Sequence, residues 1–337
     1  MDSGTVSKDQ SSSAEQQPDA PSMFEVKAIP LKGIGLVALQ DIPQGTLIIQ
    51  EKPLLVAHPG APDALEILLS SKLKKLDKPS QRQFLSLHNN FPGKHPFGGI
   101  MRTNALPCGS GSEIGAIYPT ICRINHSCLP NSQNTWNSDT EIETIFAIKP
   151  ISCGEEITIS YDRGGPSAAR QAFLKQAFGF QCSCAVCSQS PSLLRESDNR
   201  RSRIQELDDQ IGDPFRMMQN PVESLKDCHS LLQTLNAEYG GYPGALMARL
   251  YYDAFQISIA HGDKARASVF AEKAYEVRLM CEGGDTPEAK KMKNLAANPS
   301  AHSSFMAYSS KWKNTKKKLA GEVDEEAFER WLFRTSD

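Results

Sequence analysis

The chain has 337 residues, enough for about two domains of ordinary size. Its 37 Lys and Arg against 39 Asp and Glu give a formal net charge of −2, which argues against a dedicated, strongly basic nucleic-acid-binding protein, so direct nucleic-acid binding is not expected. No stretch approaches the ~18 apolar residues of a membrane span, and residues 1–22 lack the apolar run of a secretory signal. We therefore expect an intracellular protein without membrane contact, in the nucleus, the cytoplasm or both.

Short strands are predicted near the start of the chain, after a polar, low-complexity tail at residues 1–22 that we expect to be disordered. Residues alternate in polarity over 24–29, and turns containing Gly and Pro separate further β-segments at 32–38 and 46–49. Strands this short and closely spaced indicate a small irregular β domain rather than a βαβ unit.

A helical insert is predicted at about residues 63–90. Leucines recur at helical spacing in its first helix, and Pro79 begins the second. The leucines expected on one face are Leu65, Leu68, Leu69, Leu73 and Leu76. The following segment, 89–115, is rich in Gly and Pro and is predicted to be loop around a short strand near 100–105.

The second half of the chain changes from β to helical character. Residues 142–161 read as two strands and a turn, and 166–178 as a short helix. From about 200 onward apolar residues follow a helical period, and 244–260 with 264–280 are predicted to form an αα-hairpin that resembles half of a tetratricopeptide repeat (TPR). We interpret this part as an all-α, TPR-like C-terminal domain that either supports the first domain by packing or binds a partner or substrate.

A basic run lies near the C-terminus. It is predicted to be a solvated helix face, with a nuclear signal or a patch for an acidic partner as the alternative. Its members are Lys311, Lys313, Lys316, Lys317 and Lys318.

Cysteines are odd in number and clustered, which favours metal binding over disulfides in a reduced protein. Cys182, Cys184 and Cys187 place three thiols within six positions. A closed structural zinc site needs four ligands, so the fourth must come from elsewhere in the chain. The candidates for it are Cys128, Cys122, Cys153, Cys108 and His126.

Three segments in a fixed order carry a family resemblance. Residues 123–131 read Arg-Ile-Asn-His-Ser-Cys-Leu-Pro-Asn, and residues 154–161 read Gly-Glu-Glu-Ile-Thr-Ile-Ser-Tyr. They resemble the two signature motifs of SET-domain protein lysine methyltransferases, and the cysteines at 182–187 resemble the zinc-binding post-SET segment of that family. The Gly-Ile-Gly at 33–35, followed by Asp-Ile-Pro-Gln-Gly at 41–45, resembles the opening SET motif.

The resemblance implies an α+β fold: a SET-type β-fold of small sheets with a helical insert, a zinc-binding post-SET segment and an all-α C-terminal domain. The SET-and-MYND (SMYD) group is the most similar, but residues 51–104 contain no cysteine, so its MYND zinc finger is not expected here. The implied division is a tail at 1–22, a SET domain at 23–164, a post-SET segment at 165–190 and a helical domain at 200–337.

By the same resemblance the chain is expected to be a monomeric protein-lysine N-methyltransferase that uses S-adenosyl-L-methionine on histone or non-histone lysines, with a protein or peptide as substrate. The alternative is a non-catalytic SET-fold adaptor that binds peptides. The intact set of Asn125, His126 and Tyr161 favours the enzyme.

The family's site residues carry over by motif. The resemblance implies that S-adenosylmethionine contacts Lys32, Gly33, Ile34, Asn104, Asn125, His126, Tyr161 and Phe180. It implies a substrate-lysine channel formed by Leu106, Tyr161, Phe178 and Phe180. It implies that one structural zinc is held by Cys128, Cys182, Cys184 and Cys187.

Tyr161 is the expected catalytic residue. The substrate amine must be neutral to attack a methyl group, and at a pKa of about 10.4 its deprotonation near neutral pH costs roughly 4 kcal/mol. An apolar channel lowers that pKa, after which catalysis depends on alignment. The Tyr161 hydroxyl is placed to orient the amine, whereas Tyr118 is expected only to pack.

Overall fold

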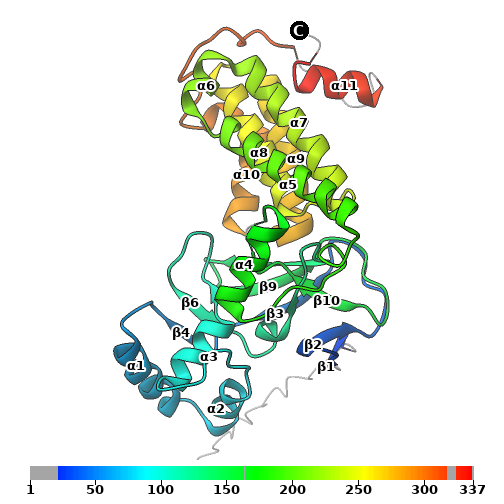
Figure 1. Ribbon diagram of the computed structural model, residues 1–337. Helices are drawn as coiled ribbons and strands as arrows, with labels where there is room; N and C mark the ends of the chain where they lie inside the picture. The colour runs from blue at the N-terminus through cyan, green and yellow to red at the C-terminus, as the bar shows by residue number, and fades with distance from the viewer. Residues whose placement is uncertain (1–21, 163, 317–323, 336–337) are drawn as a thin grey trace, which may run out of the picture.

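The computed structural model describes residues 22–162, 164–316 and 324–335. Figure 1 shows a β-rich part that carries the helical insert at one end of the molecule and a bundle of helices at the other, with α4 (Ser167–Phe178) near their junction. The expected tail lies outside the described residues apart from Ser22. Within the described ranges, no helix combines the length and apolar character needed to cross a membrane.

One small sheet joins segments that are far apart in the sequence. Its order is β1 (Phe24–Ile29), β2 (Gly33–Ala38), β10 (Glu156–Ile159) and β7 (Asn125–His126). β1 and β2 form an antiparallel hairpin, β10 runs antiparallel to β2, and β7 runs parallel to β10. Thr158 lies opposite Asn125 and Ile159 opposite His126. Both signature motifs and the opening glycines are thereby brought into one sheet.

Two further three-stranded sheets complete the β-rich part. One has the order β3 (Leu47–Glu51), β9 (Ile142–Ala147) and β8 (Ser132–Asn137), and the other β4 (Leu55–Ala57), β6 (Gly115–Ile117) and β5 (Leu106–Pro107). Fully buried Leu36, Ile145 and Ile157 pack with Tyr118 and the short 3₁₀ segment η1 (Ile121–Arg123) in a shared core. This core fixes the backbone on which the motif residues sit.

The helical insert is longer than predicted. It contains α1 (Pro62–Lys75), α2 (Lys78–Leu85) and α3 (Pro96–Asn104). The strand predicted near 100–105 is wrong, because α3 occupies those positions. Pro96 occupies the first turn of α3, where its missing N–H costs nothing, and Glu66 of α1 accepts the backbone N–H groups of Phe97 and Gly98 at 3.1 and 2.7 Å. This cap comes from another helix.

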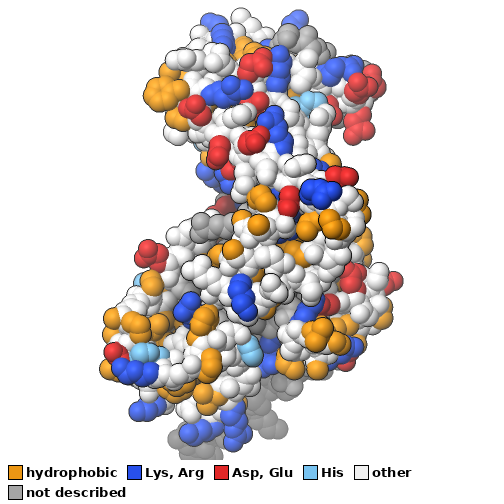
Figure 2. Space-filling view, viewed as in Figure 1, with side chains coloured by type: hydrophobic (Ala, Val, Ile, Leu, Met, Phe, Trp, Pro, Cys, Tyr) orange, Lys and Arg blue, Asp and Glu red, His pale blue; other side chains and the backbone are white. Residues whose placement is uncertain are grey.

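The expected apolar face of α1 is only partly buried. Leu69 and Leu73 are buried, whereas Leu68 is 41% exposed. Figure 2 shows hydrophobic side chains gathered over the insert, where Ile67 and Leu85 are also exposed. Over the helical bundle in the same view, positive and negative side chains are interspersed.

The C-terminal part is a helical bundle with a continuous apolar core. Its elements are α5 (Pro191–Ile211), α6 (Pro214–Gln219), α7 (Pro221–Tyr239), α8 (Ala245–Ala260), α9 (Lys264–Glu282), α10 (Pro287–Ala297), η2 (Pro299–Ala301) and α11 (Glu325–Leu332). The predicted αα-hairpin is formed by α8 and α9. Gly262 makes its turn with a φ of +83°, and the Asp263 side chain caps α9 by accepting the Arg266 N–H.

The described part of the basic run is not a helix face. Lys311 and Lys313 lie in a turn, where buried Trp312 donates its N–H to the His261 carbonyl, and Lys316 lies in irregular chain just after it. Lys317 and Lys318 lie outside the described residues. The contact between Trp312 and His261 stabilises the turn, and the spacing of the lysines gives no indication of that contact.

The bundle packs directly against the β-rich part. Gln133 of β8 accepts the N–H of Ala245 at the start of α8 at 2.9 Å, and Asn137 donates to the Asp285 carbonyl at 3.4 Å. The two parts therefore form a continuous structure in which the bundle supports the β8–β9 hairpin.

Candidate active site

A cavity of about 600 Å³ lies at the end of the first sheet. Its wall combines the β1–β2 turn, the insert, the 122–126 segment, Tyr161 and the chain at 178–184. The predicted cofactor and channel residues that line it are Lys32, Gly33, Ile34, Asn104, Asn125, His126, Tyr161, Phe178 and Phe180, and the predicted zinc ligands Cys182 and Cys184 also reach it. Leu106 does not line this cavity: it lies in β5 opposite Ala116 and packs against the core of the β-rich part, so its place in a substrate channel stays a prediction.

The insert also contributes wall residues that the sequence did not indicate. They include Ser86, Leu87, His88, Asn89, Asn90 and Thr103. The Asn104 side chain donates to the carbonyls of His88 and Ile100 at 2.7 and 2.8 Å. It therefore holds the 86–90 loop against α3 while lining the cavity. The adjacent polar residues at 88–90 were the available clue, but only the folded insert turns them toward the cavity.

The backbone of β2 at Gly35 approaches the side chain of Asn125, which lines the cavity. A Cβ built on Gly35 would lie 2.7 Å from Asn125 Nδ2, so only glycine leaves room for that amide. Asn125 Nδ2 donates to Glu156 Oε1 at 2.9 Å, and Lys32 Nζ lies 2.6 Å from Glu156 Oε2. Two polar groups of the predicted cofactor site thus converge on one carboxylate. At Gly33 the reason for glycine is different: the backbone has a φ of +82° where the β1–β2 turn enters β2, and residues with a Cβ rarely adopt this conformation.

His126 is committed to contacts within the protein. Its ring is 1% exposed, and Nδ1 accepts the backbone N–H of Tyr161 at 3.0 Å. With Nδ1 accepting, the ring proton sits on Nε2, which faces Cys128 Sγ at 3.3 Å and Asp162 Oδ2 at 3.5 Å. Burial lowers the pKa of His126 and favours this neutral form. The ring links the end of β10 to the cysteine cluster.

Tyr161 lies in an aromatic corner of the cavity. Its ring centroid is 4.8 Å from that of Phe178, 5.4 Å from His126 and 6.5 Å from Phe180. The hydroxyl donates to the Ile124 carbonyl. Burial raises the pKa of the Tyr161 phenol well above its ordinary value, and nearby Cys122 and Glu156 add to the rise. The side chain therefore remains a neutral hydroxyl with oxygen lone pairs available to a further donor.

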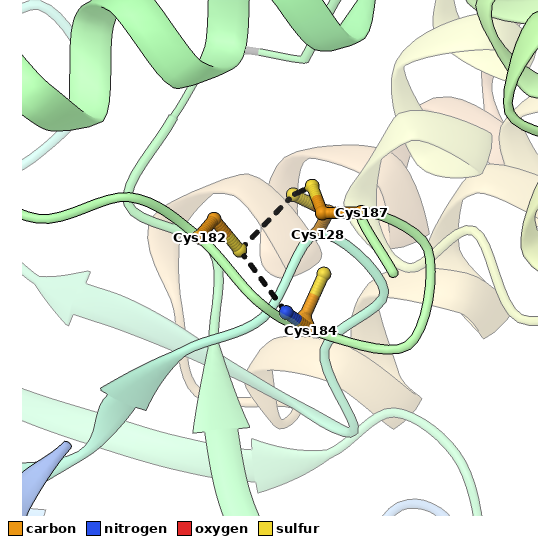
Figure 3. A group of neighbouring side chains, drawn as sticks. All are labelled: Cys128, Cys182, Cys184 and Cys187. Atoms are coloured by element: carbon orange, nitrogen blue, oxygen red, sulfur yellow. Dashed lines mark hydrogen bonds between the residues drawn. The ribbon is translucent and has the colours of Figure 1, made fainter. Parts of the chain in front are cut away.

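Four cysteine side chains form one cluster, shown in Figure 3, and Tyr161, Phe178 and Phe180 pack against it. Cys128 Sγ lies 3.9 Å from Cys182 Sγ and 3.7 Å from Cys187 Sγ, and all four sulfurs, with that of Cys184, lie within 4.8 Å of one another. A tetrahedral zinc with Zn–S bonds of about 2.3 Å requires sulfurs roughly 3.8 Å apart, so the donor set fits this ion.

Of the candidates for the fourth ligand, Cys128 joins the three clustered thiols. Cys122 instead lines the cavity and contacts the Asn104 carbonyl, and burial raises its pKa to about 12. Cys153 is exposed, and Cys108 packs against the core of the β-rich part.

The family model of the SET domain matches residues 33–162. These residues include β2, β7 and β10 of the first sheet, the insert and Tyr161, so the match covers most of the structure around the cavity. The chain is 33% identical over 288 residues to "Histone-lysine N-methyltransferase set5" of Schizosaccharomyces pombe, covering 85% of this chain and 87% of that relative. It is 31% identical over 123 residues to "N-lysine methyltransferase SMYD2" of Homo sapiens, covering 34% of this chain and 27% of that relative.

The chain belongs to the SET-domain family of protein-lysine methyltransferases and is SMYD-like. The predicted recognition, α+β fold class and enzyme class are confirmed, and the use of S-adenosylmethionine follows from the family.

Proposed function

We propose that the cavity binds S-adenosylmethionine and that its aromatic corner receives the lysine of a protein substrate. The observation that carries this proposal is the convergence of Lys32, Asn104, Asn125, Tyr161 and Phe180 on one cavity of about 600 Å³. This volume suits a ligand of nucleoside size, and the lining mixes polar groups with aromatic rings.

On the cofactor side, the residues offer several polar contacts. Lys32, Asn125 and the backbone at Gly33 and Ile34 would hold the cofactor at the edge of the first sheet. The bound cofactor would supply a methyl group on a sulfonium centre. Lys32 and Asn125 now share the Glu156 carboxylate, which keeps both side chains at the cavity.

On the substrate side, the aromatic corner performs two tasks. The rings of Tyr161, Phe178 and Phe180 exclude water, which favours the neutral form of an inserted lysine amine. Because the Tyr161 hydroxyl donates its proton to the Ile124 carbonyl, its oxygen can accept an amine N–H. This contact fixes the amine and leaves the nitrogen lone pair free for attack. The contribution is alignment, since the hydroxyl keeps its proton.

We infer that the four cysteines hold one structural zinc ion. Such an ion would join the loop at Cys128 to the segment 182–187 and so fix Phe178 and Phe180 against Tyr161. Its contribution is architectural, because a site closed by four thiolates leaves no open position for a reactant.

We propose protein lysines, including those of histones, as substrates, because the chain is similar over most of its length to the histone-lysine methyltransferase of S. pombe. The test is methyl transfer from labelled S-adenosylmethionine to core histones and to a panel of lysine-containing proteins, with Tyr161→Phe as the matched control. Label on lysine with wild type, and about 10²-fold less with the variant, supports the proposal. Wild-type protein that binds the cofactor but labels none of these substrates would favour the peptide-binding adaptor.

A further inference from the structure

A buried arginine donates to two sulfurs of the cysteine cluster. Arg170 of α4 is 1% exposed, although arginine is among the residues least often buried. Its Nε donates to Cys128 Sγ at 3.3 Å, and its Nη2 lies 3.7 Å from Cys187 Sγ. One guanidinium therefore contacts thiols from both segments of the cluster.

The charge of the loaded site explains why such a contact matters. One divalent cation and four thiolates leave a net charge of about −2. Cys128, Cys182 and Cys184 are buried, and a buried negative charge is stable only when it is paired or hydrogen-bonded. The guanidinium of Arg170 stays protonated at any ordinary pH, so it compensates about half of this charge.

The other polar groups near Cys128 do not supply a cation. Because His126 Nδ1 accepts the Tyr161 N–H, the ring has a single N–H, at Nε2, which lies 3.3 Å from the Cys128 sulfur. Asp162 adds a carboxylate oxygen 4.0 Å from the same sulfur. The Cys184 N–H faces Cys182 Sγ at 3.5 Å. Among the hydrogen bonds of the described residues, Arg170 is the positively charged donor to these sulfurs.

The remaining guanidinium nitrogen is fixed by its surroundings. Arg170 Nη1 donates to the Gly165 carbonyl and lies 3.8 Å from Asp198 Oδ1. Asp198, on α5, also accepts the N–H and the hydroxyl of Ser167, both at 2.6 Å, at the start of α4. The bundle therefore orients the helix that presents the guanidinium to the sulfurs.

We propose that Arg170 is a positioning residue of the zinc centre: it compensates the charge of the four thiolates and holds Cys128 and Cys187 in place for the ion. This inference rests on the zinc site proposed above. It predicts that metal retention depends on the N–H···S contacts of Arg170, since outer partners of metal ligands commonly contribute about 10- to 100-fold in affinity.

A matched control lies on the same cysteine. Arg201 of α5 is also buried, at 2% exposure, and its Nη2 donates at 2.9 Å to the carbonyl oxygen of Cys128, while Glu238 binds its Nε. Both arginines secure Cys128, but only Arg170 reaches the sulfur. A substitution of Arg201 therefore measures what happens when the loop at Cys128 loses a backbone contact. A substitution of Arg170 measures, in addition, the effect of losing the contact to the thiolates.

The experiment measures zinc transfer from the full-length, zinc-loaded protein to a chromogenic chelator, comparing wild type, Arg170→Lys and Arg201→Lys. We expect transfer from Arg170→Lys to be at least about tenfold faster than from wild type, and from Arg201→Lys within about threefold of wild type, even where both variants melt earlier. Arg170→Gln, which keeps one uncharged donor, should also release zinc faster than wild type and serves if the lysine variant folds poorly.

Unchanged release from the Arg170 variants, or equal acceleration in the Arg201 variant, would overturn the role of Arg170. Wild-type protein that takes up no zinc would overturn the zinc site itself, and with it the role of Arg170. The two failures are distinguishable because metal content is measured before release.

Discussion

The helical bundle is held together by contacts between helices that are close in sequence, whereas the cavity is built from residues that are far apart in the sequence. In the bundle, α8 packs on α9 and α9 on α10, each a neighbour in sequence, and the contacts are apolar, as at Leu235, Phe255 and Phe270. The cavity instead joins Lys32 to residues as distant as Phe180.

The difference is also one of chemistry. Polar groups hold the cavity together: His126 links β10 to Cys128, and Asn125 links β7 to Glu156. Apolar burial is non-directional, so a bundle substitution should lower stability without changing the site. A hydrogen bond at the cavity depends on direction, and other contacts do not make up for its loss. Removing one should therefore lower turnover or ligand affinity.

The largest effect is expected from the cysteine cluster. Cys184→Ser should remove the bound zinc and reduce turnover to background, because ion binding and the fold of residues 178–187 are coupled. Cys228→Ser, in the buried core of the bundle, should retain one equivalent of zinc even if it melts earlier. Metal analysis and methyl-transfer rates on both proteins make the comparison. Full zinc content in the Cys184 variant would contradict it.

Next in size is the effect expected from the Tyr161 hydroxyl, the proposed catalytic group. Tyr161→Phe should lower turnover by about 10²-fold, or roughly 3 kcal/mol of transition-state stabilisation, with cofactor affinity nearly unchanged because the ring is kept. Tyr118→Phe is the matched control: Tyr118 is fully buried but does not line the cavity. Its turnover should equal that of wild type. Equal rates for wild type and Tyr161→Phe would assign Tyr161 to packing.

The pH dependence should be smaller and should arise at the substrate. Between pH about 7 and about 9 the rate should rise by about tenfold in total, because the neutral fraction of the lysine amine grows and levels off once its lowered pKa is passed. Burial raises the pKa of Tyr161, so its hydroxyl remains protonated across this range and should not reverse the rise. Initial rates at saturating cofactor test this, and a rate that falls over the range would contradict it.

The smallest effect on activity is expected in the bundle. Leu235→Ala on α7 removes a side chain that is 1% exposed, and it should lower the free energy of unfolding by about 2–5 kcal/mol. Turnover of the folded protein should stay within about twofold of wild type. Thermal melts and initial rates together measure both quantities. A large fall in turnover would show that the bundle does more than support the site.

The sequence predicted local features well where the local pattern decides them. The polarity alternation at β1 and the helical period of the α8–α9 hairpin predicted these elements to within two residues of their bounds. It failed at α3, because the cap from Glu66 lies about thirty residues earlier and Gly98 and Gly99 read as loop. The TPR-like pattern likewise gave no indication that Lys311 and Lys313 would lie in turns.

For the cavity, the motifs predicted many of the residues that line it, and the tertiary structure determines the contacts that they make. The motif marks His126 but not its hydrogen bond to the Tyr161 N–H, which needs β7 beside β10. Nothing in the sequence indicated that Leu106 lies outside the cavity wall, because its position just after α3 does not determine that β5 pairs with β6. Arg170 was not indicated, since one arginine on a short helix resembles a solvated side chain.

The most direct test of the cavity as the cofactor site is a calorimetric titration of zinc-loaded protein with the demethylated product of S-adenosylmethionine. We expect one binding site in wild type, about tenfold or more weaker binding in Asn125→Ala, and unchanged binding in Asn236→Ala, an exposed asparagine of α7. Absence of binding heat in wild type, or equal affinity in all three proteins, would contradict the assignment of the cofactor to this cavity.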